Sequence, residues 1–332
     1  MSTQMSTEMT LKKYLVGLAS AVLGLVSSAT GYAADAFPQK EITLIVSFAA
    51  GGQRDTLARG VANTMSKYLG VPIVVLNVPG AGGTRGAVQL YHAPADGYTL
   101  GIGNSTEIVM QLVEKNVDYD MKKMTNIGFA QSSPTFYFVK SDSPIHSFAD
   151  LKAMHKPIRF ATYAPTVPNA VALITMAKRE GFPLTMVGGF SNVPSTILSL
   201  MRGEAELIAS SMPGAAQFLK GGQIRPILTL APNRASEFPN IPTVGDIGYA
   251  DLGFLNLAYW IIAPPGVPKD RVKILEGALL KTQKDPAFIA WAKTAGVDPY
   301  ALNSEETTKR VTELAVSLDK YKGDVEKYVP KK

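Results

Sequence analysis

Residues 42–69 read ITLIVSFAAGGQRDTLARGVANTMSKYL and contain the pattern that decides the fold. Residues 42–48 form a β-rich run with no polar face, which is typical of a central parallel strand. The glycines at 51–52 form a turn, and apolar residues then recur at helical spacing over 55–69. A strand, a glycine turn and a helix in succession predict the first half of a βαβ unit.

The same alternation continues along the chain. We expect further strands at 72–77, 99–103, 158–161, 184–187, 207–210, 227–230 and 257–263, and helices at 84–91, 168–180, 194–201 and 214–220. A helical tail is expected at 269–284, at 286–295 with Asp285 as N-cap, and from 304 to about 328 with Ser304 as N-cap. This alternation predicts two α/β units with parallel sheets covered on both faces. The pattern alone leaves open whether the units are consecutive or interleaved.

Composition excludes several classes of protein. The chain has 332 residues, about two domains' worth, and 46% of them are hydrophobic, so it has ample material for packed cores. The absence of cysteine excludes disulfide scaffolds, thiolate zinc sites and cysteine nucleophiles. Because His92, His146 and His155 match no metal or triad spacing, we expect no metal site and no cofactor. The net charge of +6 is spread along the chain, which favours anionic solutes over nucleic acid.

The amino terminus has the pattern of a secretory signal peptide. Lys12 and Lys13 precede an apolar run over 14–26, and the small residues Ala34 and Ala36 form a cleavage site. A membrane anchor is the alternative, but this run is shorter than the ~20 residues that span a bilayer. We therefore expect residues 1–36 to be removed, with a cut after Ala34 as the alternative, and the mature protein to be exported and soluble.

Glycine-rich turns follow the first two strands, over 48–55 and 79–86, and Asn104-Ser105-Thr106 follows the third. Ligands of open α/β sheets bind beyond the carboxyl ends of the strands, where glycine lets the backbone approach and helix starts offer free N–H groups. These loops predict a cradle for a carboxylate or phosphate, although each glycine alone is equally consistent with a simple turn. Neither the P-loop nor the dinucleotide fingerprint is present.

Charged residues flank these loops. The Asp55 carboxylate is placed to cap the first helix, to hold a ligand hydroxyl or amine, or both. Arg54 and Arg85 are placed either as clamps for an anion or as solvated arginines at helix starts.

Several segments together carry a family resemblance: FPQKEITLIVSFAAGGQRDTLAR, LGVPIVVLNVPGAGGTRGA, APADGYTLGIGNS, TNIGFAQSSP, IPTVGDIGY and APPGVPKDRV. With this spacing, the chain resembles the Bug family, the extracytoplasmic solute receptors of tripartite tricarboxylate transporters. The resemblance implies a type II periplasmic-binding-protein fold, with two α/β lobes, two crossing strands and a carboxylated metabolite in the interlobe cleft. It implies lobe 1 over 37–136 and 260–332 and lobe 2 over 137–259.

By match of motif, the resemblance implies ligand contacts from both lobes. From the first lobe these are Phe48, Ala50, Gly52, Arg54, Asp55, Gly82, Gly83, Thr84, Arg85, Asn104 and Ser105. From the second lobe they are Tyr163, Pro165, Thr166, Asn169, Phe190, Ser191 and Ser210. Arg54 and Arg85 depart from the family's usual residues, as does Ser210, where an acidic residue is often found. These departures disfavour amino acids and favour a di- or polyacid, or an aromatic acid stacked by Phe190 or Tyr163.

Three functions follow from this reading. The first is a monomeric periplasmic receptor that presents a small carboxylate to the permease subunits of a tripartite tricarboxylate transporter. The second is a ligand-sensing adaptor for a membrane sensor kinase, which the sequence does not separate from the first. The third is a secreted α/β enzyme, against which the missing catalytic motifs argue.

Overall fold

The computed structural model describes residues 36–113, 117–190, 193–231, 233–234, 238–253 and 255–328. The predicted signal peptide, except for Ala36, and the predicted ligand contact Ser191 lie outside these residues. Residues 40–332 form a unit separate from residues 1–39, and the description below concerns that larger unit.

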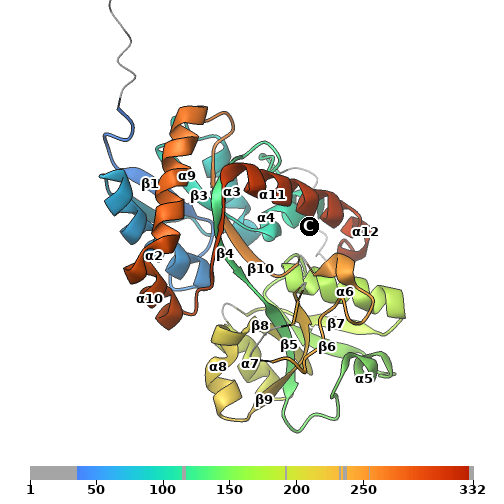
Figure 1. Cartoon of the computed structure of the whole chain (residues 1–332). Coiled ribbons are helices and arrows are strands. Elements are labelled where there is room, and N and C mark those ends of the chain that lie inside the picture. The colour runs from blue at the N-terminus through green and yellow to red at the C-terminus, as the bar shows by residue number, and fades with distance from the viewer. Residues whose placement is uncertain are drawn as a thin grey trace, which may run out of the picture. The chain divides into compact units, whose positions relative to one another are not determined.

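Two β-sheets organise this unit (Figure 1). The first has the order β11-β4-β10-β3-β1-β2, with β1 (Ile42–Val46), β2 (Ile73–Asn77), β3 (Thr99–Gly103), β4 (Thr125–Ser133), β10 (Leu257–Ala263) and β11 (Pro299–Leu302). The second has the order β7-β6-β8-β5-β9, with β5 (Thr135–Lys140), β6 (Ile158–Ala161), β7 (Leu184–Val187), β8 (Leu207–Ser211) and β9 (Ile224–Leu230). Each sheet carries its own helices, so the chain has two α/β lobes, and the lobes are interleaved in sequence.

The prediction of purely parallel sheets is wrong, because both sheets are mixed. Strand β1 pairs in parallel with β2 and β3, and β6 pairs in parallel with β7 and β8. In the first sheet β10 pairs in antiparallel fashion with β3 and β4, and β11 does so with β4; in the second sheet β5 pairs in antiparallel fashion with β8 and β9. Only Pro134 separates β4 from β5, so the chain passes directly from one sheet to the other. It returns between β9 and β10, and these passages bring β5 and β10, each antiparallel to its two neighbours, into the two sheets.

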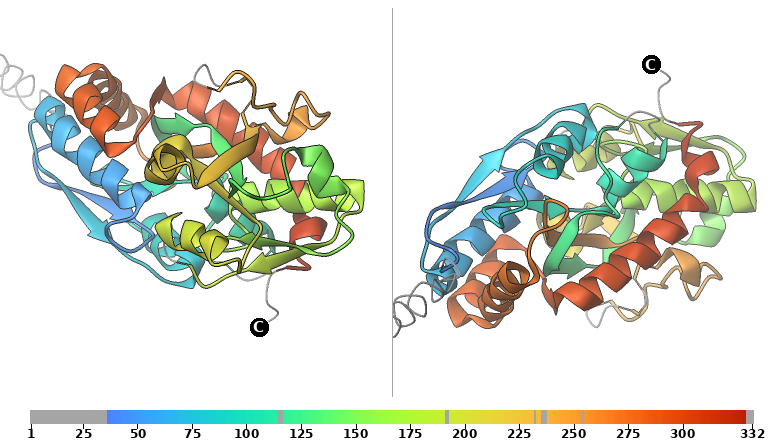
Figure 2. Two further views of the ribbon diagram at one scale, coloured as in Figure 1. Left: turned by 90° about the horizontal axis from the view of Figure 1, so that it is seen from below. Right: turned by 90° about the horizontal axis from the view of Figure 1, so that it is seen from above.

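The helices of the first half are α2 (Gln53–Leu69), η1 (Ala81–Gly83), α3 (Thr84–Tyr91), α4 (Ser105–Val113), α5 (Phe148–Lys152), α6 (Pro168–Glu180), α7 (Val193–Met201) and α8 (Met212–Lys220). Those of the second half are η2 (Ala250–Leu252), α9 (Lys269–Lys284), α10 (Pro286–Ala295), α11 (Ser304–Asp319) and α12 (Lys322–Val325). Figures 1 and 2 show α9 and α10 beside α2, whereas α11 lies along the other flank of the first sheet.

Helix ends follow local chemistry, with one correction. Asp285 caps α10 as predicted, its side chain accepting hydrogen bonds from the amides of Ala287 and Phe288. The predicted cap Ser304 is wrong: Asn303 caps α11 and forms a capping box with Glu306. The predicted helix over 304–328 is interrupted after Asp319, and α12 follows as a separate turn.

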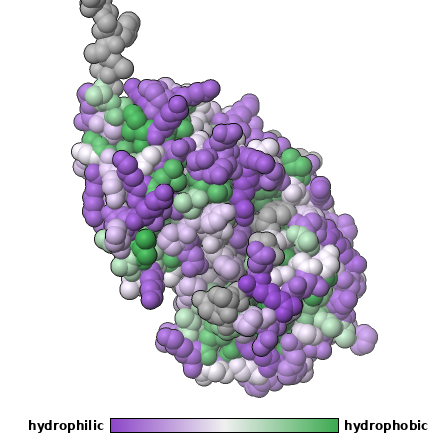
Figure 3. Space-filling model, in the orientation of Figure 1, coloured by the Kyte–Doolittle hydropathy of each residue, from purple (hydrophilic) through white to green (hydrophobic). Residues whose placement is uncertain are grey.

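Buried apolar side chains fill the space between each sheet and its helices. Trp260, Phe129 and Leu44 are fully buried at the first sheet, as are Phe136 and Phe160 at the second. On the face shown in Figure 3, hydrophilic side chains predominate and hydrophobic ones are scattered between them. No helix in the described part of the chain is both long enough and apolar enough to cross a membrane.

Candidate functional site

The first-lobe loops meet at one edge of the first sheet. Strands β3, β1 and β2 are neighbours and run in parallel, so their carboxyl ends lie together. The chain leaves β1 toward α2, β2 toward α3, and β3 toward α4. The three loops predicted to hold an anion therefore start from the same edge.

Asp55 ties the first of these loops together. Its carboxylate accepts hydrogen bonds from the Gly51 amide at 2.9 Å and from Asn77 Nδ2 at 3.0 Å, and it pairs with the Arg59 guanidinium. Asn77 also donates to the Phe48 carbonyl. Burial alone would raise the pKa of Asp55, but donation from Arg59, Gly51 and Asn77 outweighs it and lowers that pKa.

The predicted capping role of Asp55 takes a different form. Helix α2 begins at Gln53, its N-cap is Gly52, and no side chain bonds at that cap. Asp55 is the third residue of the helix and accepts from Gly51, the residue before the cap. The Asp55 carboxylate therefore fixes the loop from within the helix, while the first turn of α2 keeps main-chain N–H groups that the helix itself does not bond.

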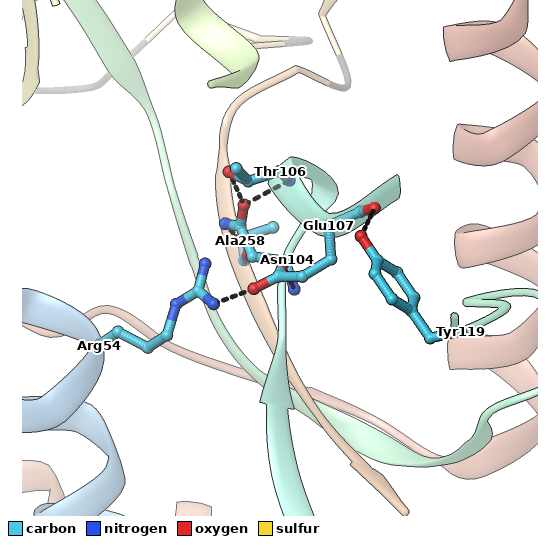
Figure 4. Close-up of polar contacts among 6 residues, drawn as sticks. All are labelled: Arg54, Asn104, Thr106, Glu107, Tyr119 and Ala258. Atoms are coloured by element: carbon cyan, nitrogen blue, oxygen red, sulfur yellow. Dashed lines mark hydrogen bonds and ion pairs between the residues drawn. The ribbon is translucent and has the colours of Figure 1, made fainter. Parts of the chain in front are cut away.

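Arg54 is buried rather than solvated, and it has an acidic partner. Its side chain forms an ion pair with Glu107 of α4, and the two residues are 6% and 2% exposed (Figure 4). Glu107 Oε2 accepts from the Asn104 amide at 3.2 Å, and Asn104 Oδ1 accepts from the Thr106 amide at 2.8 Å. Asn104 and Ser105, predicted to follow the third strand as a loop, thus lie where α4 begins.

Aromatic rings surround the Arg54 guanidinium. Its central carbon lies 4.3 Å from the centroid of the Phe48 ring and 5.3 Å from that of Tyr259 on β10. A Cβ placed on Gly83 would lie 3.0 Å from the Phe48 ring and 3.4 Å from Glu107 Oε1. Phe48, Arg54 and Gly83, all predicted from the sequence, are therefore in one place, together with the unpredicted Glu107 and Tyr259.

The second loop depends on glycine. Gly82 has φ of 62° and Gly83 has φ of 101°, a left-handed conformation that residues with a Cβ rarely adopt. Thr84 then starts α3, and Arg85, in the first turn, is exposed. In the described part of the chain, Arg85 forms no ion pair. Ala50 and Gly52 of the first loop are also exposed.

The second-lobe residues gather at the carboxyl ends of β6, β7 and β8, which are neighbours in the order β7-β6-β8. They are Tyr163, Pro165, Thr166 and Asn169 between β6 and α6, Phe190 after β7, and Ser210 in β8. Thr166 and Ser210 are buried, whereas Tyr163 is 38% exposed. The Ser210 hydroxyl donates to the Ser211 carbonyl, and the Asn169 carbonyl accepts from the Tyr137 hydroxyl.

Two tyrosines connect the residue groups of the two lobes. Burial raises the pKa of Tyr163, and its electrostatic interaction with Tyr259 raises it further. Burial likewise raises the pKa of Tyr259, against a lowering by the neighbouring Arg54. Tyr163 of the second lobe therefore lies within range of an electrostatic interaction with Tyr259, whose ring centroid is 5.3 Å from the guanidinium carbon of Arg54 in the first lobe. Apart from the undescribed Ser191, the predicted contacts form two groups linked by this aromatic pair.

Sequence reasoning missed Glu107 and Tyr259. Asn104 followed three residues later by Glu107 is a capping-box spacing, which was available as a signal for a helix start. Among the described residues, no cluster of three or more His, Asp or Glu side chains is arranged to hold a metal ion. A hollow of about 350 Å³ between α2 and α10 shares only Asp55 with the predicted site.

Comparisons with known proteins agree with this architecture. Residues 57–320 match the family model of the tripartite tricarboxylate transporter family receptor. BugT of Bordetella pertussis is 26% identical over 301 residues, covering 86% of this chain and 91% of BugT. A solved structure of a periplasmic transporter is 27% identical with a TM-score of 0.72, covering 86% of this chain and 96% of that one. Rpa4515 of R. palustris, solved with adipate, shares the fold at 22% identity with a TM-score of 0.73, covering 87% of this chain and 98% of that one.

Proposed function

Because the chain belongs to the tripartite tricarboxylate transporter receptor family, in its Bug group, we propose that it captures a small carboxylate and presents it to the permease subunits of such a transporter. The ligand is a di- or polyacid or an aromatic acid, held in the periplasm after removal of residues 1–36. The protein acts as a receptor and not as a catalyst. Adipate, present in a structure of the same fold, is itself a small carboxylate.

The observation that carries this proposal is the meeting of the three first-lobe loops around the start of α2. A helix of 17 residues with a glycine N-cap and no side chain bonded there offers main-chain N–H groups to an anion. The left-handed glycines 82–83 bring a second stretch of backbone close to the same edge. Such donors recognise a carboxylate or a phosphate without a metal or a nucleophile, and membership of this receptor family favours the carboxylate.

The second lobe supplies the selective part of the site in this proposal. Its described residues Tyr163, Pro165, Thr166, Asn169, Phe190 and Ser210 contact the remainder of the ligand, and binding draws lobe 2 (137–259) toward lobe 1 (37–136 and 260–332). Because each lobe holds only part of the site, ligand binding and closure are coupled. A Kd near 1 μM corresponds to about −8 kcal/mol, which is enough to shift such an equilibrium by a few kcal/mol.

Two measurements test the proposal. Mass spectrometry of small molecules retained by the gently purified protein is expected to find a carboxylate, and calorimetric titration with that compound is expected to show saturable binding. Arg202→Ala, a surface change at an arginine paired with Glu204, serves as the matched control for Arg85→Ala, which is expected to weaken binding. Stabilisation by amino acids alone, or turnover of the bound compound, would contradict the proposal.

A further inference from the structure

The arginines near the candidate site differ in how far they are already neutralised. Arg54 is paired with Glu107 and Arg59 with Asp55, so a carboxylate of the protein already neutralises each guanidinium group. Arg85, exposed in the first turn of α3, has no such partner among the described residues. The side chains around these loops therefore leave one positive charge for an incoming anion.

Glu107 is fixed by more than the ion pair. One carboxylate oxygen bonds Arg54 and the other accepts the Asn104 amide, while the carbonyl of Glu107 accepts from the Tyr119 hydroxyl at 2.8 Å (Figure 4). At 2% exposure, Glu107 would be left as an unpaired buried charge if a ligand carboxylate displaced it from Arg54. Breaking a buried ion pair in this way is strongly unfavourable.

Aromatic side chains neighbour the neutralised pair. The ring centroids of Phe48 and Tyr259 lie 4.3 and 5.3 Å from the Arg54 guanidinium carbon, and Tyr163, which is 38% exposed, interacts electrostatically with Tyr259. Such a lining stabilises a flat apolar group and offers no counter-charge for a second carboxylate.

We propose that Glu107 is a specificity-determining residue: by occupying Arg54 it restricts the site to one ligand carboxylate and selects flat, apolar monocarboxylates over dicarboxylates. This inference rests on the proposed function. It narrows the ligand class from a di- or polyacid or an aromatic acid to an aromatic monocarboxylate. Glu107 also accepts a hydrogen bond from the Asn104 amide at the start of α4, as in a capping box. If Glu107 had only a structural role, this hydrogen bond would be its contribution and ligand selectivity would not depend on its charge.

Glu107→Gln separates the two roles. Glutamine keeps an oxygen that accepts from the Asn104 amide but removes the charge that neutralises Arg54. The matched control is Glu206→Gln, which removes a carboxylate that directly precedes β8 and is paired with Arg159 of β6. The double variant Arg54→Gln and Glu107→Gln removes both charges, and it preserves the test if the single variant folds poorly.

The probes are matched pairs that differ by one carboxylate: benzoate against terephthalate, and hexanoate against adipate, titrated calorimetrically into the purified protein. We expect the unsubstituted protein and Glu206→Gln to bind each monocarboxylate more tightly than its dicarboxylate partner, and benzoate more tightly than hexanoate. In Glu107→Gln the freed Arg54 should shift the ratio toward the dicarboxylate by about ten- to a hundredfold, the range of a hydrogen bond to a charged group. The double variant should return to the original preference.

Each other outcome is informative. Tighter binding of dicarboxylates by the unsubstituted protein, or an unchanged ratio in Glu107→Gln, overturns this inference while leaving a carboxylate receptor intact. If no probe binds and the retained compound is not a carboxylate, the proposed function fails and the inference fails with it.

Discussion

The close approach of α3 to the end of β1 provides a quantitative test of how the site is built. A Cβ added to Gly86 would lie 2.7 Å from the Cα and 2.7 Å from the Oγ of Ser47, the residue that follows β1. Ordinary contacts begin at 3.4 Å, so Gly86→Ala requires α3 and β1 to separate by about 0.7 Å, the difference between the two distances. Overpacking of this kind costs about 1–3 kcal/mol.

Alanine also favours helix, by up to about 1 kcal/mol relative to glycine, and this gain opposes the clash. Gly277→Ala isolates that gain, because Gly277 lies within α9 and a Cβ there meets nothing within 4 Å. Gly277→Ala is expected to be neutral or stabilising. Gly86→Ala should then be about 1–3 kcal/mol less stable than Gly277→Ala.

Urea unfolding at equilibrium measures both variants, with equal m-values as the condition for comparing midpoints. Because Gly83, Thr84 and Arg85 directly precede Gly86, the same displacement should weaken carboxylate binding in Gly86→Ala but not in Gly277→Ala. Equal stability of the two alanine variants would refute the packing argument, since the clash with Ser47 would then have no cost.

Three further predictions concern single side chains. Arg54→Met should lower the free energy of unfolding by about 3–5 kcal/mol, because Glu107 is left charged and buried, and adding Glu107→Leu should restore most of that loss. Urea unfolding of the two single variants and the double variant checks this, and losses that simply add in the double variant would contradict it. Against the raising effect of burial, hydrogen bonds from Arg59, Gly51 and Asn77 hold the folded-state pKa of Asp55 below the ordinary value for an aspartate. These bonds therefore stabilise the protein above that ordinary value and lose their effect as pH falls through the folded pKa. The stability difference between the unsubstituted protein and Asp55→Asn should therefore be constant above about pH 5 and shrink in acid, and a pH-independent difference would refute this. Tyr163→Ala should weaken benzoate binding about three- to tenfold with little loss of stability, because that side chain is 38% exposed; unchanged affinity would remove it from the site.

Local pattern predicted many elements with their exact bounds. The strands at Thr99–Gly103 and Leu184–Val187 and the helices at Pro168–Glu180 and Lys269–Lys284 lie where expected. Each has a continuous apolar or helical period and a clear boundary residue, such as Pro168 in the first turn of α6. Periodicity identifies such elements because a helix buries the residues of one face at helical spacing, whereas a central strand buries a continuous run of residues.

Strand β4 shows where this reasoning stops. Its sequence, TNIGFAQSS, alternates poorly, and its polar residues Asn126 and Gln131 are buried. Strand β4 lies between β10 and β11, and the side-chain amide groups of these residues find polar partners outside those two neighbouring strands: Asn126 Nδ2 donates to Thr308 of α11 and Gln131 Nε2 to Ser133. Its neighbours lie more than a hundred residues away in the chain, so no local window contains the information that makes it a strand.

The same limit applies to Arg54. The sequence predicted either an anion clamp or a solvated side chain, whereas the structure shows a buried arginine paired with Glu107. Both predicted roles require an arginine that is not paired with an acidic side chain of the protein. Glu107, 53 residues away in the sequence, forms that ion pair with Arg54. The spacing of Asn104 and Glu107 indicates a helix start, and Glu107 does accept a hydrogen bond from the Asn104 amide. The ion pair of Glu107 with Arg54, however, cannot be predicted from sequence spacing. Charge near a ligand must therefore be counted after tertiary pairing. By that count a chain with net charge +6 presents one unpaired guanidinium at the described loops, which is why the number of carboxylates on the ligand is the property most worth measuring.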